Sequence, residues 1–488
     1  MGIEHVFVLM LENRSFDHML GFGSITGTDA ETGGATEVDG LNGNESNLYN
    51  GAEYKVTAGA DWVISTDPGH EFPNVLEQLC GPGAVYAKGG TYPAINNSGF
   101  VASYATERGA DPREIMKCYA PGQLPVLNAL AREFVVCDNW HAPMPGPTWP
   151  NRMFVHGASS GGLDHSPSTL EIAGWESIRG FPMPNGTIFD RLNAAGIPRR
   201  LYAGDDFPMV SALRGIHLDD IRHYDLFAGD VAQASYPDRY IFIEPSYDVL
   251  NDYRNGNSQH PLGDVTKGEA LIKATYEALR KSPIWTSSLL IVTWDEHGGF
   301  YDHAAPPRAV APGDTAPGNH LNANGFTFEQ YGPRVPAVVI SPLIPKNLVD
   351  HRVYDHTSIL ATVESLFGLA PLTQRDAKAN RLNELATLAT ARDDAPERLP
   401  APAVSGATPA AASEEGATVS RPAATVNQGN LPALLHAAMQ QDLKASGERA
   451  REAIVKTVAS IETRAQACAY LQEVRKKVRV LKAGASGR

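Results

Sequence analysis

Two apolar runs, each followed by oxygen-bearing side chains, constrain the fold of this chain most. The run HVFVLML at residues 5–11 shows no alternation of polar and apolar residues, and neither does most of SLLIVTW at residues 288–294. Such runs are typical of strands that are buried on both faces of a mostly parallel sheet. Each is followed at once by a polar pair: Glu12 and Asn13 after the first run, Asp295 and Glu296 after the second. Because ligands of open α/β sheets bind outside the carboxyl ends of the strands, the two runs predict one shared site.

The ligand chemistry of these four residues favours a metal ion. Carboxylates gathered in one small volume repel one another, and a bound divalent cation is the usual remedy. Oxygen and amide ligands without thiolates suit a hard metal, although zinc with carboxylates also fits. We therefore expect a divalent cation and leave Ca, Mg, Mn and Zn open. For either segment alone, a strand that simply ends in a polar turn is an equal alternative.

A third segment, HAPMPGPTWPNRMF at residues 141–154, offers a hydroxyl group. Thr148 lies between prolines that restrict the local backbone, and Asn151 and Arg152 follow where a helix could begin. A helix N-terminus stabilises anions, so Thr148 could act as a nucleophile toward a phosphorus atom. By composition alone, a rigid proline-rich turn is at least as good an interpretation.

Strand-like and helical segments alternate along the first three quarters of the chain, which predicts an α/β domain. Strands are expected within 133–141, 239–245 and 336–342 as well, and helices at 125–134, 187–196, 267–282 and 357–368. We expect a catalytic domain over residues 1–385. Residues 386–430 are rich in Ala and Pro and are expected to form a linker, and 431–488 a helical region.

Composition excludes several classes of protein. A net charge of -14 argues against general nucleic-acid binding, because phosphate neutralisation needs a surplus of Lys and Arg. The four cysteines show no CxxC spacing, which argues against a disulfide scaffold and a thiolate zinc site. The sequence has neither a membrane-spanning apolar run nor a secretory signal pattern, so we expect a cytoplasmic protein or one exported without a cleaved signal. The oligomeric state stays open.

Three motifs, in order, resemble those of the bacterial and plant non-specific phospholipase C family, which also includes bacterial acid phosphatases. They are ENRSFDHMLG from residue 12, GPTWPNR from residue 146 and DEHGGFYDH from residue 295. HPLGD at 260–264 and DHTSIL at 355–360 look like further segments of that family. The resemblance implies an alkaline-phosphatase-like core with a mostly parallel central sheet flanked by helices. The C-terminal helical tail lies outside it.

The resemblance also implies a role for each candidate residue. Metal ligands would be Glu12, Asn13, Asp295 and Glu296, with Thr148 as the nucleophile that also contacts the metal. His70 and His260 would hold the phosphoryl group or protonate the leaving group. Asp302 and His303 would orient the metal ligands, and we expect His356 to cap its helix.

The implied activity is that of a phospholipase C, which hydrolyses glycerophospholipids to diacylglycerol and a phosphorylated headgroup through a phosphothreonine. A phospholipid or other phosphate ester would be the substrate, with contact to a membrane surface as one option. The first alternative is an acid phosphatase that uses the same residues on phosphomonoesters. A sulfatase is disfavoured, since the methyl group of Thr148 blocks oxidation to an aldehyde. An inactive module that binds lipids or headgroups is the alternative from another class.

Overall fold

The computed structural model describes residues 2–176, 180–217, 220–314, 320–406 and 431–485. Its centre is a ten-stranded sheet that is mostly parallel, with antiparallel pairing at β13 and β3. The strand order is β10 (Ile221–His223), β9 (Arg199–Ala203), β11 (Tyr240–Glu244), β1 (His5–Leu11), β12 (Ser288–Trp294), β13 (Ala337–Ile340), β8 (Val135–Cys137), β14 (Leu348–Asp350), β2 (Thr26–Asp29) and β3 (Ala35–Glu37).

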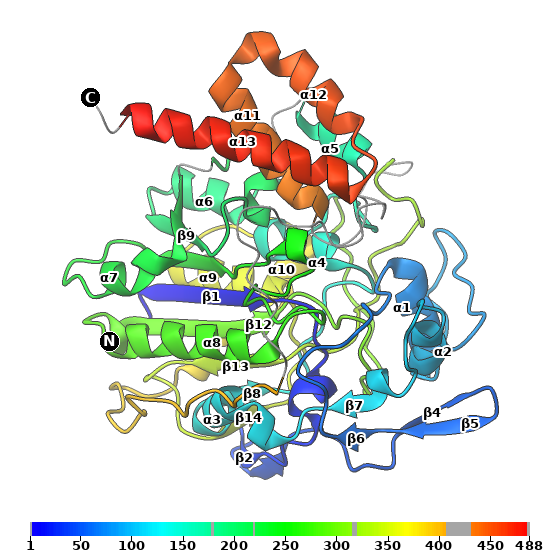
Figure 1. Cartoon of the computed structure of the whole chain (residues 1–488). Helices are drawn as coiled ribbons and strands as arrows, with labels where there is room; N and C mark the ends of the chain where they lie inside the picture. Colours follow the sequence, from blue (N-terminus) through cyan, green and yellow to red (C-terminus); the bar gives the residue numbers. More distant parts are fainter. Residues whose placement is uncertain (1, 177–179, 218–219, 315–319, 407–430, 486–488) are drawn as a thin grey trace.

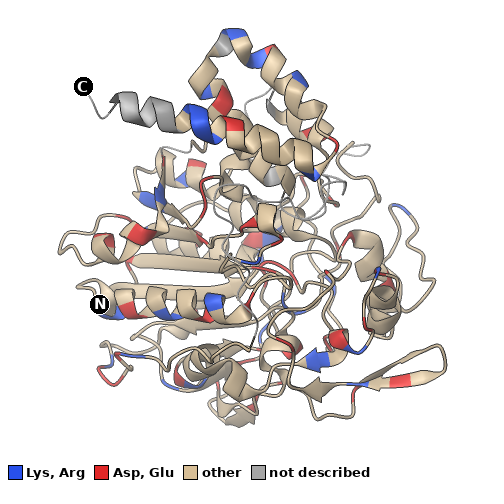
Figure 2. Cartoon of the chain, viewed as in Figure 1, with Lys and Arg blue, Asp and Glu red and all other residues tan. Residues whose placement is uncertain are grey.

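The two central strands are those that the apolar runs predicted. Every residue of β1 and of β12 is buried, and the strands pair in parallel with Leu11 beside Trp294. In Figure 2 the residues coloured as Lys, Arg, Asp or Glu lie on the helices and loops around these strands, and neither strand contains one. The absence of alternation therefore reflects burial on both faces of the sheet.

Helices flank the sheet and form two groups, each packed within itself (Figure 1). One group consists of α3 (Pro125–Glu133), α7 (Phe227–Val231) and α8 (Val265–Arg280), and the other of α4 (Thr148–Gly157), α6 (Ile188–Ala194) and α9 (Thr357–Phe367). Helix α6 begins with a capping box, in which the Thr187 hydroxyl accepts from the backbone N–H of Asp190 and the Asp190 carboxylate accepts from that of Thr187. The predicted α/β class with a mostly parallel, helix-flanked sheet is confirmed.

The predicted C-terminal helical region is also confirmed, and it packs on the rest of the chain. It contains α11 (Leu431–Ser446), α12 (Arg451–Ala459) and α13 (Arg464–Ala485), which lie at the top of Figure 1. Helices α11 and α12 contact α5 (Thr169–Glu176), where Leu435 and Met439 are completely buried. Among the described helices, none has the length and apolarity that crossing a membrane requires.

The start of the expected linker differs from the prediction. Its first residues lie against α8, where the Lys273 ammonium donates to the carbonyl of Leu399 at 2.6 Å and the Tyr276 hydroxyl to that of Pro396 at 2.6 Å. These bonds use backbone acceptors, which any sequence offers, so a composition poor in large apolar residues did not reveal them. The remainder of the expected linker, residues 407–430, lies outside the described residues.

Candidate active site

The polar pairs that follow β1 and β12 lie side by side. Glu12, Asn13, Asp295 and Glu296 have no exposed surface. The backbone of Asn13 is left-handed, with φ of 54°, a conformation that asparagine adopts more readily than most residues. This turn directs the Asn13 backbone N–H to Asp295 Oδ1 at 3.0 Å. The parallel register of the strands thus brings together the four residues expected to bind metal.

Thr148 joins this group from the first turn of α4. Its Oγ1 accepts a hydrogen bond from the side-chain amide of Asn13 at 3.0 Å, and only 2% of Thr148 is exposed. The N-terminus of α4 places a partial positive charge at this hydroxyl, which would stabilise an anion there. The proline-rich turn and the nucleophile position are therefore compatible, because the turn delivers Thr148 to the carboxylates.

The two carboxyl groups after β12 differ in their electrostatics. Burial and the charge of Glu296 outweigh the opposing effect of Arg152 and raise the pKa of Asp295 to about 6. Burial also disfavours the charge of Glu296, but the nearby His70 and His297 and the backbone N–H of Gly298 lower its pKa. Two adjacent carboxyl groups are thus held in one water-poor volume with different proton affinities.

Arg152 is a site residue to which the sequence interpretation gave no role. It lies one turn beyond Thr148 on α4, and its Nε donates to Asp295 Oδ2 at 2.9 Å while Nη2 donates to the Leu11 carbonyl at 3.0 Å. Burial opposes the charge of Arg152, but the neighbouring Tyr247 and Asp295 raise its pKa above the ordinary value. The spacing of four residues from Thr148 was the available signal, because it puts both side chains on one helical face.

His356 does not have the capping role that the sequence suggested. It occupies the N-cap position of α9, but its side chain makes no capping hydrogen bond. The Trp140 indole N–H donates to His356 Nδ1 at 3.2 Å, so the ring proton lies on Nε2, which donates to the Asp295 carbonyl at 2.7 Å. Burial lowers the pKa of His356 to about 3, so the ring is a neutral donor to the backbone of a site residue.

His70 lies next to the carboxylates, just before α1 (Phe72–Cys80). Its Nδ1 is 3.4 Å from Glu296 Oε1, and 8% of the residue is exposed. Burial favours the neutral ring, but the charges of Glu296 and Asp67 raise its pKa to about 9. At neutral pH His70 is consequently cationic.

His260 is close to His70 but has the opposite protonation. Burial, together with the positive charge of His70, lowers the pKa of His260 well below 6.5. The backbone N–H of Leu262 donates to its Nδ1 at 3.3 Å, which leaves the proton on Nε2, 3.7 Å from Asp67 Oδ2. The Tyr253 ring is stacked on His260 with centroids 3.4 Å apart and an interplanar angle of 5°.

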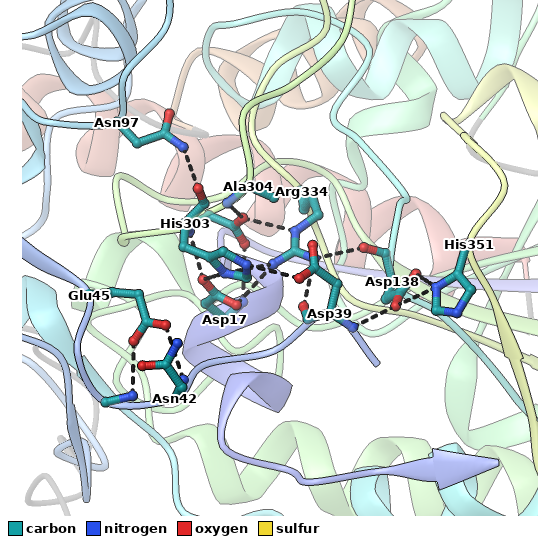
Figure 3. A network of polar contacts seen from close by, with 12 residues as sticks. Asp17, Asp39, Asn42, Glu45, Asn97, Asp138, His303, Ala304, Arg334 and His351 are labelled. Carbon is teal, nitrogen blue, oxygen red and sulfur yellow. Dashed lines mark hydrogen bonds and ion pairs between the residues drawn. The ribbon is translucent and has the colours of Figure 1, made fainter. Parts of the chain in front are cut away.

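His303 belongs to a separate polar network, drawn in Figure 3, which Asp302 joins through Arg334. Arg334, which is completely buried, donates from Nε to Asp302 Oδ1 and from Nη2 to Asp17 Oδ1, each at 2.9 Å. His303 Nδ1 lies 2.7 Å from Asp17 Oδ2, and its Nε2 lies 3.1 Å from Asp39 Oδ1. The expected role of Asp302 and His303 as residues that orient the metal ligands is not visible in these bonds.

Asp17, Asp302 and His303 also form a group that could hold a metal ion, since each offers a ligand atom and these atoms lie within 4.8 Å of one another. The guanidinium of Arg334, however, already binds both carboxylates. A dication there would have to displace or oppose this buried cation.

The residues around Thr148 fit a divalent cation better. They present carboxylate, amide and hydroxyl oxygens, and Asn13 Oδ1 is a buried oxygen without a hydrogen-bond partner among the described residues. The carboxylates of Glu12, Asp295 and Glu296 outnumber the neighbouring cations Arg152 and His70. A hard, oxygen-preferring cation would balance this excess of negative charge.

The family model and the curated relatives agree on one family. The Phosphoesterase family matches residues 3–370. A protein named non-specific phospholipase C6 from Arabidopsis thaliana is 36% identical over 420 residues, which cover 82% of this chain and 75% of the relative. Phospholipase C B from Mycobacterium tuberculosis is 28% identical over 409 residues, which cover 75% of this chain and 74% of the relative. Among solved structures, a protein in the alkaline phosphatase superfamily from Vibrio parahaemolyticus has a TM-score of 0.34 and 17% identity over 52% of this chain and 63% of its own.

Proposed function

This chain belongs to the phosphoesterase family and is a phosphoric ester hydrolase, and we propose that it acts as a phospholipase C on glycerophospholipids. The observation that carries the proposal is the position of Thr148. Its hydroxyl lies at a helix N-terminus, bonded to Asn13 and beside buried carboxylates, as a nucleophile for a phosphate ester requires. The similarity to plant and bacterial phospholipases C supports a phosphodiester rather than a phosphomonoester as the substrate.

A divalent cation would be held by Glu12, Asn13, Asp295, Glu296 and Thr148. Bound there, it would supply Lewis acidity toward a phosphate oxygen and favour the ionised form of the threonine hydroxyl. Arg152 would keep the Asp295 carboxylate ionised and oriented through its bond at 2.9 Å. His356 would fix the backbone of the same residue from the other side.

In the reaction, Thr148 Oγ attacks the phosphorus atom in line with the bond to diacylglycerol. A bond forms between Oγ and phosphorus while the bond from phosphorus to the glycerol oxygen breaks, which leaves the phosphorylated headgroup on Thr148. Water then hydrolyses this phosphothreonine. The first step releases diacylglycerol, and the second releases the headgroup phosphate.

The two histidines are suited to different roles. His70, with a pKa of about 9, carries a proton at neutral pH and would donate it to the departing glycerol oxygen. His260 is neutral and has its proton on Nε2, so it would donate a hydrogen bond to a phosphoryl oxygen. We place both residues and the whole reaction in a catalytic domain of residues 1–385.

The decisive experiment compares substrates in parallel. Purified protein would be assayed on phosphatidylcholine, phosphatidylethanolamine and p-nitrophenyl phosphate, each with and without a chelator. We expect the phospholipids to be hydrolysed faster than the monoester, and the chelator to suppress every activity. Faster turnover of p-nitrophenyl phosphate than of either phospholipid would identify an acid phosphatase instead. No turnover of any substrate with metal present would favour a binding module.

A further inference from the structure

Arg464, the first residue of α13, reaches from the C-terminal helices into a loop of the catalytic domain. Its Nη2 donates to the Val249 carbonyl at 2.6 Å and lies 2.9 Å from Asp252 Oδ1. Only 8% of Arg464 is exposed, so water screens this ion pair less than it would a surface pair. The two contacts bind both ends of a single turn, residues 249–252.

The loop that Arg464 binds is strained. Asp248 has φ of 53°, Asp252 of 51° and Tyr253 of 62°, and the last two are consecutive residues in the left-handed region. Aspartate tolerates this conformation better than most residues, but a bulky residue such as Tyr253 adopts it only where the surrounding structure compensates the cost. The contacts made by Arg464 are one such compensation, because they fix the carbonyl of Val249 and the side chain of Asp252.

The strained residues lead directly to the candidate active site. Tyr253, next to Asp252, stacks on His260 with ring centroids 3.4 Å apart, and it is 5% exposed. This stack covers one face of an imidazole whose Nδ1 accepts from Leu262. The ring plane of His260, and hence the direction of its Nε2 proton, thus depends on where the loop holds Tyr253.

We propose that Arg464 is a positioning residue of the active site, through which the C-terminal helices hold Tyr253 against His260. This inference rests on the role in phosphoryl binding proposed above for His260. It gives the C-terminal helical region a function in catalysis, although none of the residues proposed to contact the substrate belongs to it.

A double-mutant cycle between Arg464 and His260 tests the proposal in the full-length, metal-loaded protein. The substrate is whichever of phosphatidylcholine and phosphatidylethanolamine the wild type hydrolyses faster. We expect Arg464→Met to lower kcat/KM about tenfold, because small displacements of a catalytic group are costly. Arg464→Lys should restore part of this loss. In a His260→Ala background, Arg464→Met should cost less than about twofold, since the group on which Arg464 acts is then missing.

A matched control lies on the same helix. Arg475 of α13 pairs with Asp206 of the catalytic domain at 3.5 Å, and Arg475→Met should keep near-normal activity. If Arg464→Met does not fold, Tyr253→Leu replaces it in the cycle, because it removes the stacked ring without changing α13. The inference would be overturned if Arg464→Met, or Tyr253→Leu in its place, lowered kcat/KM equally in the wild-type and His260→Ala backgrounds. This outcome would leave the proposed function intact. Normal activity of His260→Ala would overturn the role of His260 and this inference together.

Discussion

Two buried acidic clusters lie a few residues apart in the same two motifs, and their charge balance differs. In the first cluster, Glu12, Asp295 and Glu296 face one guanidinium, that of Arg152, and the imidazolium of His70. In the second, Asp17 and Asp302 are bridged by Arg334, and His303 adds another positive charge (Figure 3). The buried carboxylates of the first cluster outnumber its cations, whereas those of the second, Asp17 and Asp302, are matched by Arg334 and His303. Asp39, which also pairs with both of these cations, has a side chain that is 62% exposed.

We interpret this difference as one between the proposed metal site and a structural element. Buried carboxylates that lack enough neighbouring cations can be balanced by a bound metal. Burial and the charge of Asp17 outweigh the effect of Arg334 and raise the pKa of Asp302 to about 6, as burial and Glu296 do for Asp295, so the clusters differ in the number of cations near them and not in this shift. Proximity of acids and histidines is therefore a weaker indication of a metal site than an uncompensated charge.

The largest expected effect concerns Thr148, the nucleophile that we propose for the first cluster. Thr148→Ala should lower turnover by about a thousandfold or more, since the covalent route loses its attacking oxygen. Thr148→Ser should keep some activity, because it preserves the oxygen but not the methyl group that restricts χ1. Steady-state kinetics measure both variants, and elemental analysis establishes that the metal is still bound. Near-normal turnover by Thr148→Ala would exclude the covalent mechanism.

Removal of the bridging cation should instead affect the second cluster through stability. Arg334→Met leaves Asp17 and Asp302 buried without their guanidinium, which should cost about 3–5 kcal/mol of unfolding free energy. Denaturant unfolding with metal present measures the loss. The folded fraction should bind as much metal as the wild type. A stable Arg334→Met protein that has lost its metal would place the metal in the second cluster.

Matched substitutions of one aspartate from each cluster give the next smaller effect. Asp295→Asn should weaken metal binding by about a hundredfold or more, because it removes an ionised ligand. Asp302→Asn should leave the metal affinity close to that of the wild type. Calorimetric titration of each metal-free variant with Mn²⁺ or Zn²⁺ measures its metal affinity. Equal losses in both variants would contradict the assignment of separate roles.

The sequence allowed the fold class and the strand ends to be predicted, because both depend on local patterns. The unbroken apolar runs before Glu12 and Asp295 required burial on two faces, and the parallel register then fixed their neighbours. Arg152 and His356 were not predicted as parts of this site. They reach Asp295 from α4 and α9, and the positions of these helices depend on tertiary packing rather than on nearby residues.

The expected role of Asp302 and His303 depended on tertiary packing in the same way. Their motif resembles a metal-site segment, but their bonding partner Arg334 lies about thirty residues later, outside the motifs that carry the resemblance. Charge compensation of this kind depends on which distant cation the fold brings near. It cannot be read from the spacing of acids and histidines.

The smallest expected effect is a pH dependence of the stability that His303 gives to the second cluster. Burial disfavours the charge of His303, but its hydrogen bonds with Asp17 and Asp39 raise its pKa to about 10, above the ordinary 6.5. A group whose pKa is raised on folding adds stability that is complete below pH 6.5 and is lost as the pH rises toward 10. His303→Gln should therefore cost about 1–2 kcal/mol at pH 6, a figure reduced because the side chain is 21% exposed. At pH 10 the unfolding free energies of the variant and the wild type should converge. Thermal and denaturant unfolding across this range measure the difference, and a cost that does not change with pH would show that His303 contributes by packing rather than by its charge.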